Sequence, residues 1–97
     1  MKPAKAILAG TIYTPQEEIE DGVILIEGHR IVKVGPRDRV RVPAGATVID
    51  NQDRIIVPGF IDVHIHGAAG HDLMEATPEA LAAVSAYLAR HGTTAYL

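Results

Sequence analysis

The sequence predicts an α/β protein in which an all-β segment precedes the first strand–helix–strand unit of a larger parallel architecture. Three observations predict it: short apolar runs separated by turn residues up to Val57, a break at Pro58-Gly59, and an amphipathic helix flanked by two apolar strands. A strand, a helix and a strand in this order form a βαβ unit with parallel strands and a right-handed crossover. Two parallel strands alone are not a fold, so the sequence is interpreted as a fragment.

The composition is that of a globular chain, and it excludes several classes of partner. Of the 97 residues, 47% are hydrophobic and 22% are charged, as in ordinary globular domains. The net charge of −3 gives no basic field for nucleic acid or an anionic membrane, so we expect a small-molecule partner. We find no signal peptide and no run of roughly 18 apolar residues that would span a membrane. Cysteine is absent, which is compatible with the reducing cytoplasm, where we expect the protein to be.

The all-β segment is expected to contain five short strands. They cover residues 5–13, 23–27, 31–34, 47–50 and 54–57. Gly28 lies in the short connection between the second and third strands, which favours a hairpin. The last two strands are expected to form another pair, joined by the polar residues 51–53.

A strand over residues 60–66, a glycine-rich loop over 67–76 and a helix are expected after the break. Thr77 is suited to cap the helix and Pro78 to occupy its first position, and Gly92 is expected to end it in a left-handed conformation. The next strand begins at Thr93. Residues expected in the core are Met74, Leu81, Val84 and Leu88.

Two histidines in the strand at 60–66 are the main candidates for chemistry. Side chains alternate along a strand, so Asp62, His64 and His66 share one face, and the aliphatic residues between them form the other, which is expected to pack under the helix. The two imidazoles would start about 6.6 Å apart along a buried strand and could converge on one ion through bonds of roughly 2.0–2.1 Å. The strand ends at His66, and ligands collect at such carboxyl ends. The alternative is a polar, partly exposed strand edge with no ligand.

The ten residues Pro-Gly-Phe-Ile-Asp-Val-His-Ile-His-Gly at 58–67 resemble the signature of the amidohydrolase superfamily, and the resemblance covers essentially the whole chain. Residues 67–75 and 89–94 are most similar to the N-acetylglucosamine-6-phosphate deacetylase family within it. The resemblance implies a (β/α)8 metal-dependent hydrolase barrel, with its first strand, first helix and the start of its second strand in residues 58–97. It also implies that residues 1–57 form the N-terminal part of a β-sandwich domain.

The resemblance further implies a site and a reaction. His64 and His66 correspond to metal ligands of the family, for a divalent ion that is expected to be zinc, with iron, manganese or cobalt as alternatives. The implied reaction converts N-acetylglucosamine 6-phosphate to glucosamine 6-phosphate and acetate by metal-assisted hydrolysis. The general base and the other ligands are expected beyond Leu97, so these 97 residues alone are expected to be inactive. The full-length protein is expected to be a homo-oligomer.

Other residues near the pair have two open interpretations. Asp62 is a candidate to orient an imidazole, or it satisfies backbone donors. Gly67, Gly70, His71 and Asp72 are candidates for a loop that contacts the substrate, although polar loop residues more often cap turns.

Three other functions stay open from the sequence. A hydantoinase-like or dihydroorotase-like cyclic amidohydrolase shares the motif, but Ala68 stands where dihydroorotases carry an arginine for a substrate carboxylate. A non-catalytic relative would keep the barrel as a scaffold, which retention of both histidines disfavours. A self-standing β module would leave the apolar faces of the βαβ unit exposed.

Overall fold

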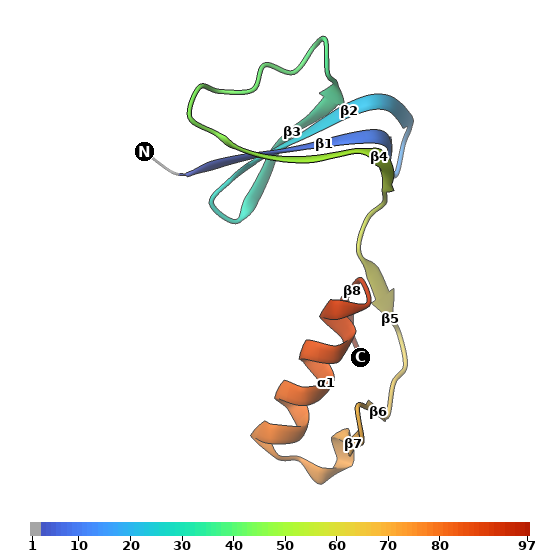
Figure 1. The fold of residues 1–97 in the computed structure, drawn as a ribbon. Helices are drawn as coiled ribbons and strands as arrows, with labels where there is room; N and C mark the ends of the chain where they lie inside the picture. The colour runs from blue at the N-terminus through green and yellow to red at the C-terminus, as the bar shows by residue number, and fades with distance from the viewer. Residues whose placement is uncertain (1–2) are drawn as a thin grey trace. The chain divides into compact units, whose positions relative to one another are not determined.

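The computed structural model describes residues 3–97, so the first two residues of the expected β domain lie outside the described part. The chain divides into two units, the first ending at Pro58 and the second beginning at Gly59 (Figure 1). No helix among residues 3–97 is long and apolar enough to cross a membrane.

The first unit is a four-stranded sheet, which confirms the predicted all-β segment. Its strands are β1 (Ala4–Tyr13), β2 (Glu18–Glu27), β3 (Arg30–Pro36) and β4 (Thr47–Ile56). They lie in the order β3-β2-β1-β4. The pairs β1–β2 and β2–β3 are antiparallel, whereas β4 runs parallel to β1 (Figure 1).

The hairpin between β2 and β3 forms where the sequence predicts it. Glu27 pairs with Arg30, so only Gly28 and His29 lie in the turn. Gly28 has a φ of 59°, the left-handed backbone that two-residue hairpin turns require and that glycine adopts without steric cost.

The prediction that residues 47–50 and 54–57 form a separate pair of strands is wrong. Residues 47–56 form the single strand β4, in which the polar residues 51–53 continue the strand instead of forming a turn, and Val57 lies just beyond its end. The register between β1 and β4 shifts between Ala9 and Thr11, so β4 accommodates extra residues at that point. The residues whose composition suggests a turn therefore form a bulge within the parallel pair of β1 and β4.

Gly10 explains why β4 can bulge at this point. A Cβ atom on Gly10 would lie 2.5 Å from the carbonyl oxygen of Gln52. The carboxylate of Asp50 accepts a hydrogen bond of 3.1 Å from the Gln52 N–H and so fixes the local backbone. The missing side chain on β1 and the local bond on β4 together hold the bulge.

Replacing Gly10 by alanine is expected to lower the free energy of unfolding by about 1–3 kcal/mol, because the added methyl group meets backbone atoms that cannot rotate away. Urea unfolding would measure the loss. Gly45→Ala is the matched control, since a Cβ there meets no atom within 4 Å, and only its positive φ costs about 1 kcal/mol. Equal losses in the two variants would contradict the proposed role of Gly10.

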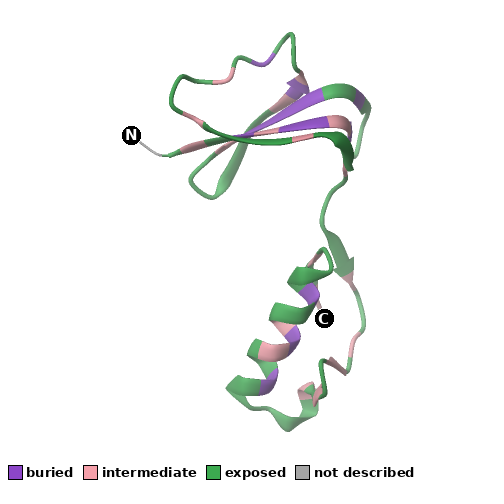
Figure 2. Cartoon of the chain, viewed as in Figure 1, coloured by how far each residue is buried: buried purple, intermediate pink, exposed green. Residues whose placement is uncertain are grey.

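The core of the first unit lies on both faces of the central strands. One cluster contains Ala6, Leu8, Val23, Leu25 and Val40. The other contains Ala9, Ile12, Ile19 and Ile24. Successive side chains of a strand point to opposite faces, which separates the two clusters. Figure 2 shows the buried residues gathered on β1 and β2, whereas β4 is exposed or half-buried along its length.

The second unit contains the predicted βαβ arrangement. Its elements are β5 (Phe60–Asp62), β6 (Gly67–Ala68), β7 (His71–Asp72), the 3-10 turn η1 (Leu73–Glu75), α1 (Pro78–Arg90) and β8 (Thr93–Tyr96). Strands β5 and β8 pair in parallel, and α1 packs against β6, β7 and β8. The predicted fold class, an N-terminal β portion followed by a first βαβ unit, is therefore confirmed.

Both ends of α1 follow the sequence signals. The Thr77 side chain accepts a hydrogen bond of 3.1 Å from the Ala80 N–H, and Pro78 is the first helical residue. Gly92 has a φ of 88° just after the helix, as a left-handed terminator requires.

Two predicted core residues of this unit are exposed. The buried face of α1 is formed by Ala80, Val84 and Leu88, four residues apart, whereas Leu81 is 54% exposed. Leu81 follows Ala80 by one position, which rotates it by about 100° from the buried line. Met74 is 82% exposed in η1. The prediction for Leu81 is wrong because only one narrow row of residues on α1 is buried. The prediction for Met74 is wrong because η1 contains no buried residue.

Candidate metal centre

The strand that carries the histidines is shorter and more exposed than the sequence predicts. Strand β5 ends at Asp62, whose carboxylate accepts a hydrogen bond of 3.1 Å from the His64 N–H. This local bond draws the backbone away from regular pairing. Ile61 and Val63 are 66% and 74% exposed, so the predicted buried strand with its aliphatic face under the helix is wrong for the described residues.

The histidine segment nevertheless stays alongside the end of β8. The Leu97 N–H donates to the carbonyl oxygen of Asp62 at 2.9 Å, and the Ile65 N–H donates to the carbonyl oxygen of Leu97 at 3.0 Å. The two bonded positions, Asp62 and Ile65, are three positions apart in sequence, whereas in a regular parallel ladder they would be two positions apart. One extra residue is therefore accommodated beside His64.

The imidazoles of His64 and His66 converge. Their Nε2 atoms are 2.9 Å apart, and their ring centroids are 4.7 Å apart with an angle of 76° between the planes. A hydrogen bond at this distance requires a proton on one Nε2 and a lone pair on the other, and which ring donates depends on the tautomer. Both side chains are exposed, so two lone pairs can be presented at one accessible point when both protons lie on Nδ1.

This arrangement fits part of a divalent metal site. A separation of 2.9 Å lets both Nε2 atoms reach one ion through bonds of about 2.0–2.1 Å. Among residues 3–97, no group of three or more His, Cys, Asp or Glu side chains is placed to hold a metal ion. The pair therefore supplies two ligands, and a complete site needs others. The metal-binding role of His64 and His66 stays a prediction.

Asp62 takes one of its two predicted roles. Its carboxylate bonds to the backbone of His64 rather than to a described imidazole nitrogen, so it shapes the segment between the strand end and the first histidine. Orientation of a ring by Asp62 stays a prediction.

The loop after His66 is a small hairpin. Gly67 pairs with Asp72, and Ala68 pairs with His71. The turn residues Ala69 and Gly70 have φ values of 53° and 79°, a conformation in which both turn residues are left-handed.

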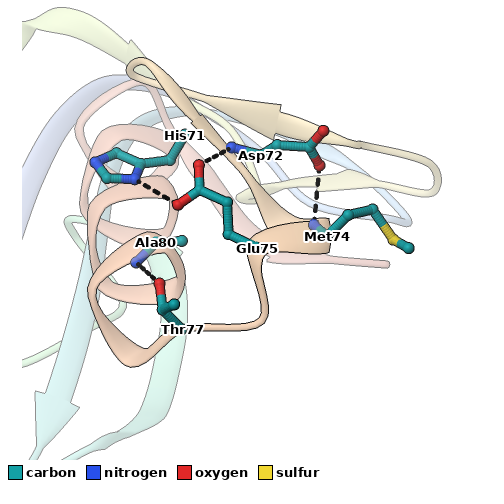
Figure 3. A network of polar contacts seen from close by, with 6 residues as sticks. All are labelled: His71, Asp72, Met74, Glu75, Thr77 and Ala80. Atoms are coloured by element: carbon teal, nitrogen blue, oxygen red, sulfur yellow. Dashed lines mark hydrogen bonds and ion pairs between the residues drawn. The ribbon is translucent and has the colours of Figure 1, made fainter.

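A network of polar contacts closes the hairpin onto η1 (Figure 3). Asp72 accepts a hydrogen bond of 2.9 Å from the Met74 N–H. Glu75 returns through Oε1, which accepts from the Asp72 N–H at 3.0 Å, and its Oε2 lies 3.4 Å from Nδ1 of His71. These reciprocal bonds form a capping box. His71 and Asp72 thus have structural roles, and contact between the loop and a substrate stays a prediction.

Sequence reasoning missed Glu75, although a signal for it was present. An acidic residue three positions after Asp72 is the capping-box pattern. The hydrogen bond from the Asp72 backbone is the main reason that the pKa of Glu75 lies below its ordinary value, and the hydrogen bond with the His71 side chain lowers it further.

The hairpin is expected to loosen at acid pH. A carboxyl group whose pKa is lowered by folding stabilises the folded state above its unfolded pKa, about 4.3 for Glu, and that contribution is lost as the pH falls through the folded pKa. NMR titration of the Glu75 carboxyl carbon and the Asp72 amide would follow the change. The variant Glu75→Gln should remove this transition from the Asp72 amide, and its persistence there would assign the effect to another group.

Comparison with known proteins supports the sequence resemblance. No protein-family model matches the chain. The chain is 35% identical over 86 residues to N-acetylglucosamine-6-phosphate deacetylase of Bacillus subtilis (strain 168), a match that covers 89% of the chain and 22% of the relative. It is 45% identical over 65 residues to 5-methylthioadenosine/S-adenosylhomocysteine deaminase of Symbiobacterium thermophilum, covering 64% of the chain and 15% of that relative.

The structural likeness extends over nearly the whole chain. The crystal structure of N-acetylglucosamine-6-phosphate deacetylase from Pasteurella multocida matches with a TM-score of 0.86 and 25% identity, covering 97% of this chain and 24% of that chain. These likenesses confirm the resemblance to the amidohydrolase superfamily. Within the superfamily, they confirm the closer resemblance to the N-terminal part of N-acetylglucosamine-6-phosphate deacetylase. The chain spans less than a quarter of the length of these two curated relatives, 22% and 15% respectively.

Proposed function

We propose that the protein carrying this segment is a metal-dependent amidohydrolase that hydrolyses N-acetylglucosamine 6-phosphate to glucosamine 6-phosphate and acetate. The observation that carries the proposal is the convergence of two Nε2 atoms at 2.9 Å in a chain that resembles deacetylases over most of its length. In the reaction, water adds to the acetyl carbon, the C–N bond breaks, and the amine leaves with a proton.

Within this proposal, His64 and His66 hold a divalent ion, which would polarise the amide carbonyl and acidify water when bound. Imidazole nitrogen suits zinc, and iron, manganese or cobalt also accept it. The two rings present their lone pairs from the segment after β5, and Asp62 fixes the backbone that leads into it. The remaining ligands and the general base are assigned to sequence beyond Leu97.

The proposed architecture is a (β/α)8 barrel preceded by a β-sandwich, with residues 1–57 in the sandwich and 58–97 in the barrel. The parallel pairing of β5 and β8 supports the barrel. Apolar side chains that are uncovered in the described chain also support it, because the interior of a barrel and the helices around it would cover side chains such as Phe60 and Ile61, which are 61% and 66% exposed. We further propose that the whole protein is a cytoplasmic homo-oligomer.

The deaminase relative favours a second candidate function, hydrolytic deamination of an adenosine-type nucleoside. That reaction uses the same attack by metal-activated water but releases ammonia from a ring carbon. The identity of 45% over 65 residues supports this candidate, whereas the match over 86 residues supports the deacetylase.

The test uses the protein at its full length, including any sequence beyond these 97 residues. Metal analysis should find a bound divalent ion, and N-acetylglucosamine 6-phosphate should release acetate. Ammonia from 5-methylthioadenosine without acetate from the sugar would favour the second candidate. A folded protein that binds no metal would reject both and leave the non-catalytic scaffold.

A further inference from the structure

The segment that carries the two histidines is held differently at its two ends. At its start, β5 and the Asp62 carboxylate fix the backbone up to His64. At its end, the His66 carbonyl oxygen accepts a hydrogen bond of 2.8 Å from the Leu73 N–H. The Ile65 N–H is bonded to the Leu97 carbonyl oxygen just before His66, so the placement of His66 depends in part on where the backbone of Leu73 lies.

Leu73 is the first residue of η1, and a three-residue turn has little stability of its own. Its geometry is enforced by the capping box, in which Asp72 accepts from the Met74 N–H and Glu75 accepts from the Asp72 N–H (Figure 3). The Glu75 carboxylate also contacts His71, on the strand β7 that pairs with β6 immediately after His66. A single side chain thus ties η1 to both residues of β7.

We propose that Glu75 is a positioning residue for the histidine pair. Its carboxylate holds the hairpin and η1 in the conformation that presents the Leu73 N–H to His66, and so keeps the ring of His66 directed at that of His64. This inference rests on the proposed metal-binding function, which it deepens by naming a residue that tunes affinity without contacting the ion.

The mechanism depends on reach more than on charge, because loss of the charge weakens these hydrogen bonds whereas loss of reach removes them. A glutamine at 75 has the same length and keeps an oxygen that can accept from the Asp72 N–H. An aspartate keeps the charge but is one methylene shorter, so its oxygens fall short of that N–H. If Glu75 instead acted through its charge, the order of these two variants would be reversed.

The experiment measures Zn²⁺ affinity of the metal-free protein at full length by competition with a chromogenic chelator, together with the absorption spectrum of the Co²⁺ form. Supporting residues around metal ligands typically change affinity by about 10–100-fold. We expect Glu75→Ala to weaken Zn²⁺ binding within that range and alter the Co²⁺ spectrum, Glu75→Asp to weaken binding less, and Glu75→Gln to weaken it least. Glu79→Ala, an exposed acidic residue in the first turn of α1, should change nothing.

The outcomes separate this inference from the proposed function. If Glu75→Ala does not fold, the comparison of Glu75→Asp with Glu75→Gln decides. Parent-like Zn²⁺ affinity and an unchanged Co²⁺ spectrum in Glu75→Ala, or tighter binding by Glu75→Asp than by Glu75→Gln, would overturn the positioning role while leaving the metal site intact. A parent protein that binds no metal would overturn both proposals, and metal binding without acetate release would reject only the deacetylase.

Discussion

Replacing either His64 or His66 by alanine is expected to weaken metal binding by more than about 100-fold, since loss of mere supporting residues around ligands already costs 10–100-fold. Each variant removes one of two Nε2 atoms that lie 2.9 Å apart, and no third described side chain joins them in a metal-binding group. Chelator competition and metal analysis of the full-length protein would measure the loss. Acetate release is expected to fall with it.

Stability distinguishes loss of a ligand from loss of the fold. Both imidazoles are exposed, so their removal from the metal-free protein should change the free energy of unfolding by less than about 0.5 kcal/mol. His29→Ala is the matched control, because His29 is an exposed histidine in the β2–β3 turn and should leave metal affinity unchanged. Unchanged affinity in both His64→Ala and His66→Ala would end the metal hypothesis.

The parts of the fold that the sequence predicts correctly depend on interactions between residues that are close in sequence. Thr77, Pro78 and Gly92 set the ends of α1 through groups within a few residues of one another. Gly28 likewise closes a two-residue turn. The error at β4 arises instead from contacts between residues distant in sequence. The polar residues 51–53 continue a strand through contact with Gly10, which lies some forty positions earlier. No local pattern connects Gly10 to them.

At the candidate site, too, the local features are predicted correctly and those that depend on distant residues are not. Alternation along an extended segment predicts that His64 and His66 approach each other, and their rings do so, although β5 has already ended at Asp62. The predicted burial of that segment fails because it depends on neighbours, and β5 pairs only with β8 among the described residues. The capping box that Glu75 forms could have been predicted from the sequence, since it is a local pattern. The connection from Glu75 to His66 could not, because it depends on the folded hairpin.

Gly67→Ala is expected to open the hairpin after His66, at a cost of about 1–3 kcal/mol in unfolding free energy. A Cβ atom on Gly67 would overlap the backbone carbonyl oxygen of His71 across the β6–β7 pair, and neither strand can yield without breaking the pairing. Urea unfolding and Zn²⁺ competition would register the two consequences.

The matched control for that variant lies in the same hairpin. Gly70→Ala meets no atom within 4 Å and costs only about 1–2 kcal/mol for its left-handed backbone, so the pairing should survive with parent-like metal affinity. Weaker Zn²⁺ binding in Gly67→Ala but not in Gly70→Ala would mean that the pairing of β6 with β7, rather than overall stability, determines the position of His66. Equal affinity in both variants would show that the histidine pair keeps its geometry without the hairpin.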